Sequence, residues 1–361
     1  MLLTVPNLDS TTSPWREVVG LAKHLPREEF QLTICALRQD GVEESRPLFE
    51  QMGVECFVAR FRPRGRSLSR LVEWLRDGRS IAKHSPFDLQ HSMDFTSSPL
   101  EALRSRRYAR KFLFSQRNMN QGGHPLLLKI KAKVARGIIC VSDATYRFMS
   151  GLGISGKLAR IHPGIEVEEI AWRPPAPRPD GVFRLLMVGH VVRLKRIVDA
   201  IGAIAQLAAE FPGLRLEIAG RVDDPAYKAE LDQLIQDRGL GRRVSFLGPR
   251  KDVFDLMRGA DALLHAAESE AFGMAILEAM AIGLPVIAPA IQGPKEIVEH
   301  NESGLLVAVG DVCSYADAVR ALIRSPDLAA RLAERARKRV ETAFSSRRMA
   351  AEMARFYEAL V

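Results

Sequence analysis

Cysteine is scarce in this chain, with 4 residues among 361. Cys35, Cys56, Cys140 and Cys313 are dispersed and show no metal-ligand spacing. This pattern excludes a disulfide-stapled scaffold and a structural zinc motif. We therefore expect reduced, buried thiols in a cytoplasmic protein, and no metal site.

Long hydrophobic runs are also absent. No segment reaches the ~18 consecutive apolar residues that a membrane-spanning helix requires. The first six residues are apolar, but no positive region precedes them and no cleavage site follows them. We expect them to form a first strand and not a signal peptide.

No Gly-x-Gly-x-x-Gly follows a predicted strand, which disfavours a dinucleotide-dependent oxidoreductase. The charge is uneven: residues 60–136 hold 18 Lys/Arg and 5 Asp/Glu, in a chain of net charge +9. This block lacks a set of aromatic residues interleaved with its charges, so we expect no nucleic-acid partner. A basic surface of this kind can bind an anionic membrane or an acidic acceptor, or can simply be solvated.

Strand patterns alternate with helix patterns along both halves of the chain, which predicts α/β architecture with two doubly wound parallel sheets. The length of 361 residues also favours two domains. Four prolines between residues 173 and 179 mark a linker. We predict a first domain at 1–168, joined by a last helix at 345–361, and a second domain at 169–344.

The predicted strands are 2–8, 29–37, 54–59, 88–91, 111–115, 138–141, 184–188, 215–219, 244–247, 262–266, 286–288 and 304–307. The predicted helices are 15–25, 47–52, 68–83, 98–103, a helix capped at 142–143, 197–211, 227–238, 254–259, 274–282, 295–299 and the tail 327–361. Ligands of such sheets bind at the carboxyl ends of the strands.

The stretch 266–298 organises the second half. Its apolar helix 274–282 is closed by Gly283 and Pro285. Glu278 is the only charged residue between Ala271 and Pro294. Since a lone carboxylate is costly to bury without a partner, we expect Glu278 to face a polar ligand; the alternative is an exposed stripe.

Glu270 lies eight residues earlier, before the helix. The helix N-terminus near Gly273 and Met274 would lie between the two acids, where free N–H groups and the helix dipole form an anion site. Two acids that accept hydroxyl hydrogen bonds, around an end that binds phosphate, suit a sugar nucleotide.

The turn after the strand at 184–188 carries His190, Arg193 and Lys195, which suit a diphosphate. Gly220-Arg221 and Leu247-Gly248 end two further strands of the same predicted sheet. The acids at 223–224 are expected to cap a helix and not to bind a metal.

These motifs together resemble the family 4 glycosyltransferases, retaining enzymes of the GT-B fold. The matching segments are 188–189, Lys195, 218–220, 244–248, 260–261, the EAFGMAILEAM run at 270–280, 283–286 and 304–307, with 138–142 and 163–166 in the first half. The match is continuous from about residue 138 to 308 and looser before it.

The resemblance implies two Rossmann-like domains facing across a cleft, with a C-terminal helix that crosses back to the first. It implies that Glu278 binds the donor ribose, that Glu270 positions the donor sugar and that Lys195 binds the diphosphate. The implied donor site comprises His190, Arg193, Lys195, Arg221, Leu247, Gly248, Glu270, Phe272, Gly273, Met274, Ala275 and Glu278.

The chain departs from the family pattern in three places. His190 stands where the family usually has Arg, and Arg193 is expected to compensate. Asp9 to Ser13 replace a Gly-Gly pair in the first loop, and their hydroxyls are candidates for binding phosphate or acceptor. Arg117 lies where many relatives have His, and we count it as a candidate for catalysis. His91 is a further candidate, for which a structural role is the alternative.

We therefore expect a retaining, metal-independent glycosyltransferase without a cofactor. Its donor would be a nucleotide-diphosphate sugar, and UDP follows the family's habit. The acceptor would be a glycan or a lipid-linked glycan, with peripheral contact of the basic first domain at the inner membrane face. The alternatives are another GT-B enzyme, such as an epimerase or phosphorylase, and a non-catalytic sugar-nucleotide binder.

Overall fold

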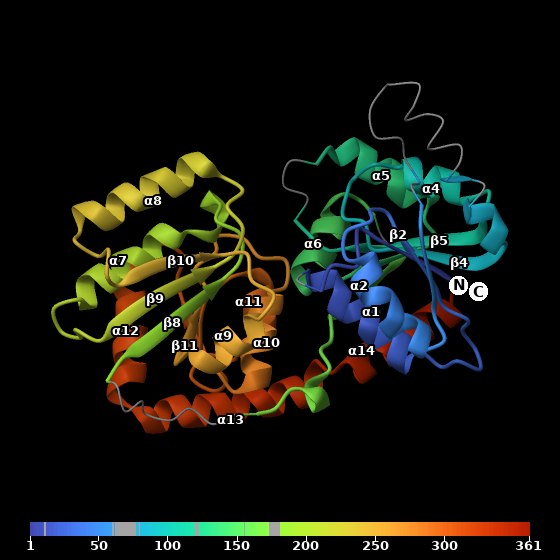
Figure 1. Cartoon of the computed structure of the whole chain (residues 1–361). Helices are drawn as coiled ribbons and strands as arrows, with labels where there is room; N and C mark the ends of the chain where they lie inside the picture. The colour runs from blue at the N-terminus through green and yellow to red at the C-terminus, as the bar shows by residue number, and fades with distance from the viewer. Residues whose placement is uncertain are drawn as a thin grey trace. The chain divides into compact units, whose positions relative to one another are not determined.

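The computed structural model describes residues 1–10, 12–59, 61, 77–78, 80–119, 123–154, 156–172 and 181–361. Its chain divides into two compact units: Met1–Glu166 with Ser346–Val361, and Val167–Ser345 (Figure 1). Most of the predicted helix 68–83 and the linker prolines at 173–179 lie outside the described residues. So do seven Lys/Arg of the basic block: Arg60, Arg62, Arg64, Arg66, Arg70, Arg76 and Arg79.

The first unit contains a parallel sheet of 7 strands in the order β3-β2-β1-β4-β5-β6-β7. The strands are β1 Leu2–Val5, β2 Thr33–Ala36, β3 Glu55–Val58, β4 Phe87–Ser92, β5 Ala109–Gln116, β6 Gly137–Cys140 and β7 Leu158–Arg160. The described part of this unit includes the helices α1 Ser13–His24, α2 Val42–Gln51, α4 Leu100–Ser105, α5 Pro125–Val134, α6 Asp143–Gly151 and α14 Ser346–Glu358.

The second unit has a parallel sheet of 6 strands in the order β10-β9-β8-β11-β12-β13. Its strands are β8 Phe183–Val188, β9 Leu214–Ala219, β10 Val244–Gly248, β11 Ala262–Leu264, β12 Val286–Pro289 and β13 Leu305–Val307. Its α-helices are α7 Ile197–Leu207, α8 Pro225–Asp237, α9 Val253–Gly259, α10 Met274–Ile282, α11 Gln292–Ile297, α12 Val312–Arg324 and α13 Pro326–Ala343. The predicted doubly wound α/β architecture is thus confirmed for both units.

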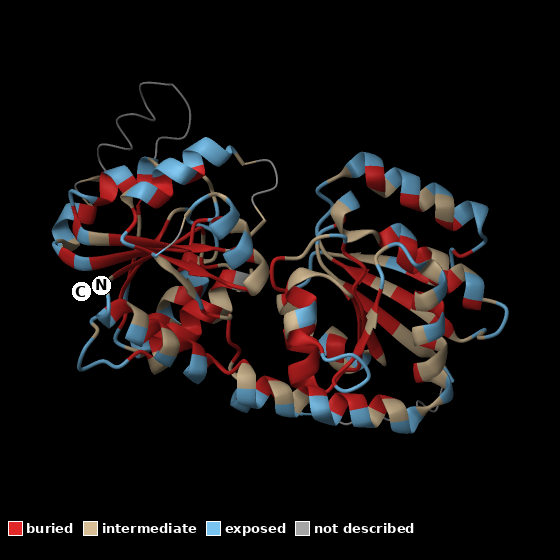
Figure 2. Cartoon of the chain, turned by 180° about the vertical axis from the view of Figure 1, so that it is seen from behind, coloured by how far each residue is buried: buried red, intermediate tan, exposed pale blue. Residues whose placement is uncertain are grey.

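In both sheets the first strand is central, the next strands are added toward one edge, and the later strands are added on the other side of the first. In the second unit the chain runs from β8 out to β10, then returns to add β11 on the other side of β8. The crevice at such a reversal, at the carboxyl ends of the strands, is where doubly wound sheets bind ligands. The strands themselves are mostly buried, and the outward faces of the helices are exposed (Figure 2).

The last helix, α14, belongs to the first unit although the second unit precedes it in sequence. Met349, Met353 and Tyr357 of α14 are buried in one cluster with residues of α1 and β1. The Gly164 N–H also donates to the Met349 sulfur at 3.2 Å. The predicted return of the C-terminal helix to the first domain is confirmed.

Two helices were missed by the sequence patterns. Helix α5 buries Leu128, Lys131 and Ala132 and exposes Leu126, Leu127 and Ile130, so its aliphatic residues do not form a single buried stripe. Helix α12 follows the predicted strand 304–307 directly and lies before the predicted helical tail. The predicted cap of α6 is confirmed, since the Ser142 hydroxyl accepts from the Thr145 N–H at 3.1 Å.

Candidate active site

The candidate site lies where β8 and β11 stand side by side at the reversal of the second sheet. Lys195 comes from the segment after β8 and Glu270 from the segment after β11. The Lys195 ammonium donates to Glu270 Oε2 at 2.6 Å, and both side chains keep about a fifth of their surface exposed, 22% and 19%. The fold thus joins two predicted site residues that are 75 positions apart.

His265 is a site residue that the sequence reasoning missed. It directly follows β11 and is buried, with Nε2 3.4 Å from Glu270 Oε2, a long contact for a hydrogen bond. Burial lowers the pKa of His265, so its imidazole is neutral at pH 7. A histidine at the carboxyl end of an otherwise apolar predicted strand was the available signal.

Glu270 is ionised although it is mostly buried. Burial by itself would raise the pKa of this carboxyl, but the charge of Lys195 and the contact with His265 outweigh it and hold the pKa well below its usual range. An ionised carboxylate accepts hydrogen bonds only, which suits the hydroxyl groups of a sugar.

The loop that carries Glu270 is held by the start of α11. The Glu270 N–H donates to the Gln292 side-chain carbonyl at 3.0 Å, and the Gly293 N–H donates to the Glu270 carbonyl at 3.2 Å. A Cβ at Gly293 would lie 2.3 Å from the Phe272 Cα, so only glycine fits there. The Phe272 ring is buried and packs edge-on against Phe344, so its contribution to a ligand site is its backbone.

Helix α10 begins at the site with Gly273, whose φ of 116° favours glycine. Among the described residues, the Met274 and Ala275 N–H groups have no hydrogen-bond partner. These two positions are half-buried, and the other seven residues of the helix are buried. Glu278 lies one turn further along the same face at 8% exposure, so the alternative of an exposed stripe is wrong.

The ends of β8, β9 and β10 meet beside this helix. A Cβ at Gly220 would lie 1.9 Å from the Gly189 carbonyl oxygen, so these two chain segments are in direct backbone contact. The Gly220 N–H donates to the Gly248 carbonyl at 2.8 Å. Leu247 and Gly248 are half-buried at this rim, and Gly189 lies against the Lys195 side chain.

Three other residues of the predicted donor site, His190, Arg193 and Arg221, contact acids after β9. His190 Nδ1 lies 2.5 Å from Asp223, and Arg221 also donates to Asp223 at 2.5 Å. These contacts, that of Arg221 above all, lower the pKa of Asp223 to about 2. Arg193 pairs with Glu230 of α8 and lies 5.2 Å above the Tyr227 ring. Their predicted role at the diphosphate stays a prediction.

Of the acids at 223–224, Asp224 caps a helix, as expected. Its carboxylate accepts from the Tyr227 N–H at 2.9 Å and caps α8. The part of the chain that the structure describes contains no group of three or more His, Cys, Asp or Glu residues placed to hold a metal ion.

The two candidates of the first unit are both held by protein contacts, His91 fully buried and Arg117 half-buried. His91 is buried, with Nδ1 2.7 Å from the Tyr357 hydroxyl and Nε2 2.8 Å from the Ser115 hydroxyl. Arg117 forms a bidentate ion pair with Glu17. Glu17 was not among the residues predicted from the sequence. These contacts favour the structural alternative for His91. In the first loop, the Thr12 hydroxyl donates to the Asp9 carbonyl at 2.8 Å.

Comparison with known proteins identifies the family of this chain. The profile described as Glycosyl transferases group 1 matches residues 168–339, and that of Glycosyltransferase Family 4 matches residues 16–169. The N-acetyl-alpha-D-glucosaminyl L-malate synthase of Bacillus anthracis is 32% identical over 173 residues, which is 48% of this chain and 44% of that relative. Across the curated relatives compared, the chain spans 21–60% of their length.

Solved structures match over almost the whole chain. Anabaena Alr3699/HepE, crystallised with UDP and glucose, has a TM-score of 0.81 and 21% identity and covers 99% of both chains. WaaG, a glycosyltransferase involved in lipopolysaccharide biosynthesis, has a TM-score of 0.71 and 17% identity and covers 98% of both. The fold is therefore that of the GT-B glycosyltransferases, and the chain belongs to glycosyltransferase family 4, group 1.

Proposed function

We propose that this protein is a retaining, metal-independent glycosyltransferase that moves a sugar from a nucleotide-diphosphate sugar to a glycan acceptor. The observation that carries the proposal is the Lys195–Glu270 contact beside the N-terminus of α10, at the reversal of the second sheet. This arrangement combines a cation, helix N–H groups and an ionised acid at the carboxyl edge of the second sheet, where such sheets bind ligands.

The electrostatics of transfer match these groups. Breaking the anomeric C–O bond places positive charge on the sugar and negative charge on the departing diphosphate. The Lys195 ammonium has three donors, of which one goes to Glu270, and the others can bind diphosphate oxygens. The Met274 and Ala275 N–H groups add the positive end of a helix dipole, so these donors supply the charge that a divalent metal would otherwise provide.

The two acids would hold the sugars. Glu270 is fixed in orientation by Lys195 and by the Gln292 bond to its own backbone, and would accept from hydroxyls of the donor sugar. Glu278, one turn beyond Met274 on the same face of α10, would accept from the donor ribose, as the resemblance to the family implies. His190, Arg193 and Arg221 would reach the donor by leaving their acid partners.

UDP is the proposed nucleotide of the donor because HepE was crystallised with UDP and with UDP-glucose. A glycan or lipid-linked glycan is the proposed acceptor, supported by the role of WaaG in lipopolysaccharide biosynthesis. Among the described residues no helix is long and apolar enough to cross a membrane. We place the protein in the cytoplasm, in peripheral contact with the inner membrane face.

Thermal shift with UDP, GDP, ADP and their sugars, each with and without EDTA, tests the donor site. A ligand that binds the folded state raises the unfolding midpoint by mass action. We expect UDP and a UDP-sugar to raise it equally with and without EDTA. A shift that requires metal, or no shift with any nucleotide, contradicts the proposed site.

A non-catalytic sugar-nucleotide binder is the second candidate. The pairing of His190 with Asp223 and of Arg193 with Glu230 favours it, because these side chains are already held by acids and would have to leave them to bind a diphosphate. Slow hydrolysis of the UDP-sugar separates the two. An enzyme releases UDP over hours and Glu270→Gln slows that release, whereas a binder shows neither effect.

A further inference from the structure

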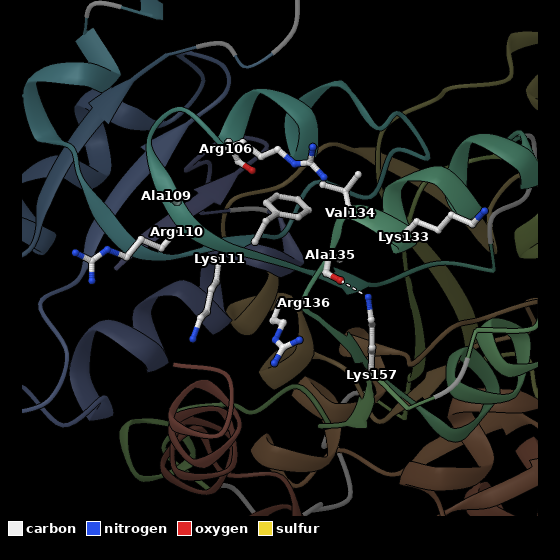
Figure 3. Close-up of a pocket in the computed structure, with 11 residues that line it drawn as sticks. Arg106, Ala109, Arg110, Lys111, Lys133, Val134, Ala135, Arg136 and Lys157 are labelled. Atoms are coloured by element: carbon white, nitrogen blue, oxygen red, sulfur yellow. Dashed lines mark hydrogen bonds between the residues drawn. The ribbon is translucent and has the colours of Figure 1, made fainter.

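A pocket of cations in the first unit shows charged groups that are already satisfied. It lies at the amino ends of β5, β6 and β7 and is lined by Arg106, Arg110, Lys111, Lys133, Arg136 and Lys157 (Figure 3). Four of these six side chains are exposed to water. The other two, Lys111 and Lys157, donate to the carbonyls of Val361 and Ala135 at 2.5 and 3.0 Å. A buried polar atom without a partner points more strongly to function.

Such an atom lies at the candidate donor site. Among the described residues, the buried Nε2 of His265 makes no hydrogen bond. It lies 3.4 Å from Glu270 Oε2, beyond the ordinary length of an N–H···O bond. His265 is 4% exposed, so water does not replace the missing partner. Burying an unpartnered polar atom destabilises a fold, and such atoms are typical of functional sites.

The proton of the His265 ring is assigned to Nε2. Burial lowers the pKa of His265, so the neutral imidazole carries one ring proton at pH 7. The ionised Glu270 carboxylate can only accept hydrogen bonds. A bare Nε2 would set two acceptors against each other, whereas Nε2–H turns a donor toward the carboxylate.

The backbone of His265 is fixed from two sides. Its N–H donates to the Ile287 carbonyl of β12 at 2.8 Å, and its own carbonyl accepts from the buried Tyr315 hydroxyl at 3.3 Å. Glu270 instead lies in the loop between β11 and α10. A change in the separation of the two side chains therefore comes from rotation of the Glu270 side chain.

Few charged groups surround the Glu270 carboxylate. Among the described residues, the side chains that contact it are Lys195 and His265. Glu268 of the same loop has Arg196 as its partner, at 3.7 Å. Helix α11 presents a neutral amide to the Glu270 backbone. The charge state of Glu270 therefore depends on the lysine and the histidine.

A bound donor would change this balance. Its diphosphate would attract the Lys195 ammonium and place negative charge near Glu270. Both effects favour the protonated form of the carboxyl, which is the poorer acceptor for sugar hydroxyls. A second donor that does not bind phosphate would keep Glu270 ionised. His265 is placed to be that donor, because its ring lies on the carboxylate and is closed off from water.

We propose that His265 is a positioning residue for Glu270: when the diphosphate of a bound donor draws Lys195 away, the His265 Nε2–H closes onto Glu270 Oε2. The inference rests on the proposed transferase function and deepens it. The two atoms need to approach by only a few tenths of an ångström, since N–H···O bonds are about 2.7–3.2 Å long. Glu270 thereby stays ionised and keeps one orientation toward the donor sugar.

Three variants at one position test the proposal, with UDP release from saturating UDP-glucose as the readout. Glutamine places an amide N–H near the position of Nε2, asparagine is too short to do so, and leucine has no donor. We expect His265→Leu and His265→Asn to lower kcat by about tenfold or more, with KM changed by less than about twofold. His265→Gln should stay within about threefold of the unaltered protein. Equal losses in all three variants would overturn the proposal.

The pH profile separates positioning from packing. Without the Nε2–H, the pKa of Glu270 in the donor complex rises, so the acid limb of kcat in His265→Leu should move up by about one pH unit. The acid limb of kcat/KM reports the free enzyme, in which Lys195 still holds Glu270, and should move less. An unmoved kcat limb, or an equal shift of both limbs, contradicts the proposal.

A purely structural role predicts different results. Because the ring nitrogen is unpartnered, His265→Leu should unfold at the same or a higher temperature than the unaltered protein. Because His265 acts through Glu270, adding His265→Leu to Glu270→Gln should slow UDP release by less than about twofold further. A lowered midpoint together with equal losses in both backgrounds would make His265 a packing residue.

NMR of the histidine rings gives a readout without turnover. Adding UDP should move the His265 Nε2–H proton downfield, and the signal is identified by its absence from His265→Gln. An unmoved signal, or a ring proton on Nδ1, overturns this inference and leaves the proposed function standing if the unaltered protein releases UDP. An unaltered protein that neither binds UDP nor releases it from a UDP-sugar overturns the proposed function itself.

Discussion

Glu270 and Glu278 are the two acids of the candidate site, and their surroundings differ. Glu270 has a cation at 2.6 Å, whereas Glu278 is buried at 8% exposure in an otherwise apolar helix. If Glu278 accepts from ribose hydroxyls, Glu278→Gln replaces charge-assisted hydrogen bonds with neutral ones and lowers UDP affinity by about tenfold. Isothermal titration measures this, with the exposed Glu334→Gln as control. Equal affinity in both variants would remove Glu278 from the donor site.

His91 makes the first unit sensitive to acid. Burial lowers its pKa to about 3, against an ordinary value of 6.5. The unfolded chain therefore takes up a proton that the folded chain excludes, and the stability that the neutral imidazole contributes is present above pH 6.5 and lost as the pH falls towards 3. The thermal midpoint of His91→Asn should fall less between pH 7 and pH 5 than that of the unaltered protein. Parallel pH profiles would count against this assignment.

At the scale of elements, the contact between the ends of β8 and β9 depends on one glycine. A Cβ at Gly220 would lie 1.9 Å from the Gly189 carbonyl oxygen, a distance that the backbone must increase by moving. We expect Gly220→Ala to destabilise the fold by about 3 kcal/mol, in chemical denaturation. Gly241→Ala is the control, since a Cβ there meets no atom within 4 Å. Similar stability of the two variants would mean that the ends of β8 and β9 can move apart without loss of stability.

Helix α14 contributes to the core of the first unit from the far end of the chain. Met353 is 1% exposed there, so Met353→Ala leaves a cavity and should cost about 2–4 kcal/mol. Hydrogen exchange should rise in α1, α14 and β1 and stay unchanged in α12 and α13. A rise confined to α12 and α13 would contradict the assignment of α14 to the first unit.

The helices α10 and α5 show what local sequence patterns can and cannot predict. The bounds of α10 were predicted correctly as 274–282 because glycine marks both ends of an apolar run. Helix α5 was missed because its buried side mixes Leu128 and Ala132 with Lys131 while three other aliphatic residues are exposed, which blurs the periodic pattern that predicts a helix. Its orientation depends on carbonyl groups of Asp94 and Thr96, more than thirty residues away, and no local pattern contains them.

The whole molecule consists of two units, each with its own sheet and core. Because the proposed donor site lies entirely in the second unit, UDP should protect the segments after β8 and β11 and the start of α10 from hydrogen exchange. We expect protection there and unchanged exchange in β2 and β3 of the first unit. Protection of β2 and β3 alone would place the nucleotide elsewhere.

The sequence by itself determined the alternation of strands and helices, the family and the bounds of α10, because these depend on periodicity, glycine positions and short motifs. It also singled out Glu270 and Glu278, whose roles stay a prediction. Only the tertiary structure decided which charges meet. Parallel strands bring chain segments 75 residues apart to one edge, where Lys195 contacts Glu270 and His265 joins them. The same folding gives His190 a partner 33 residues on, at Asp223, and gives Arg117 one 100 residues back, at Glu17. Such contacts depend on which residues the fold brings together in space, and the spacing of residues along the chain does not specify this proximity.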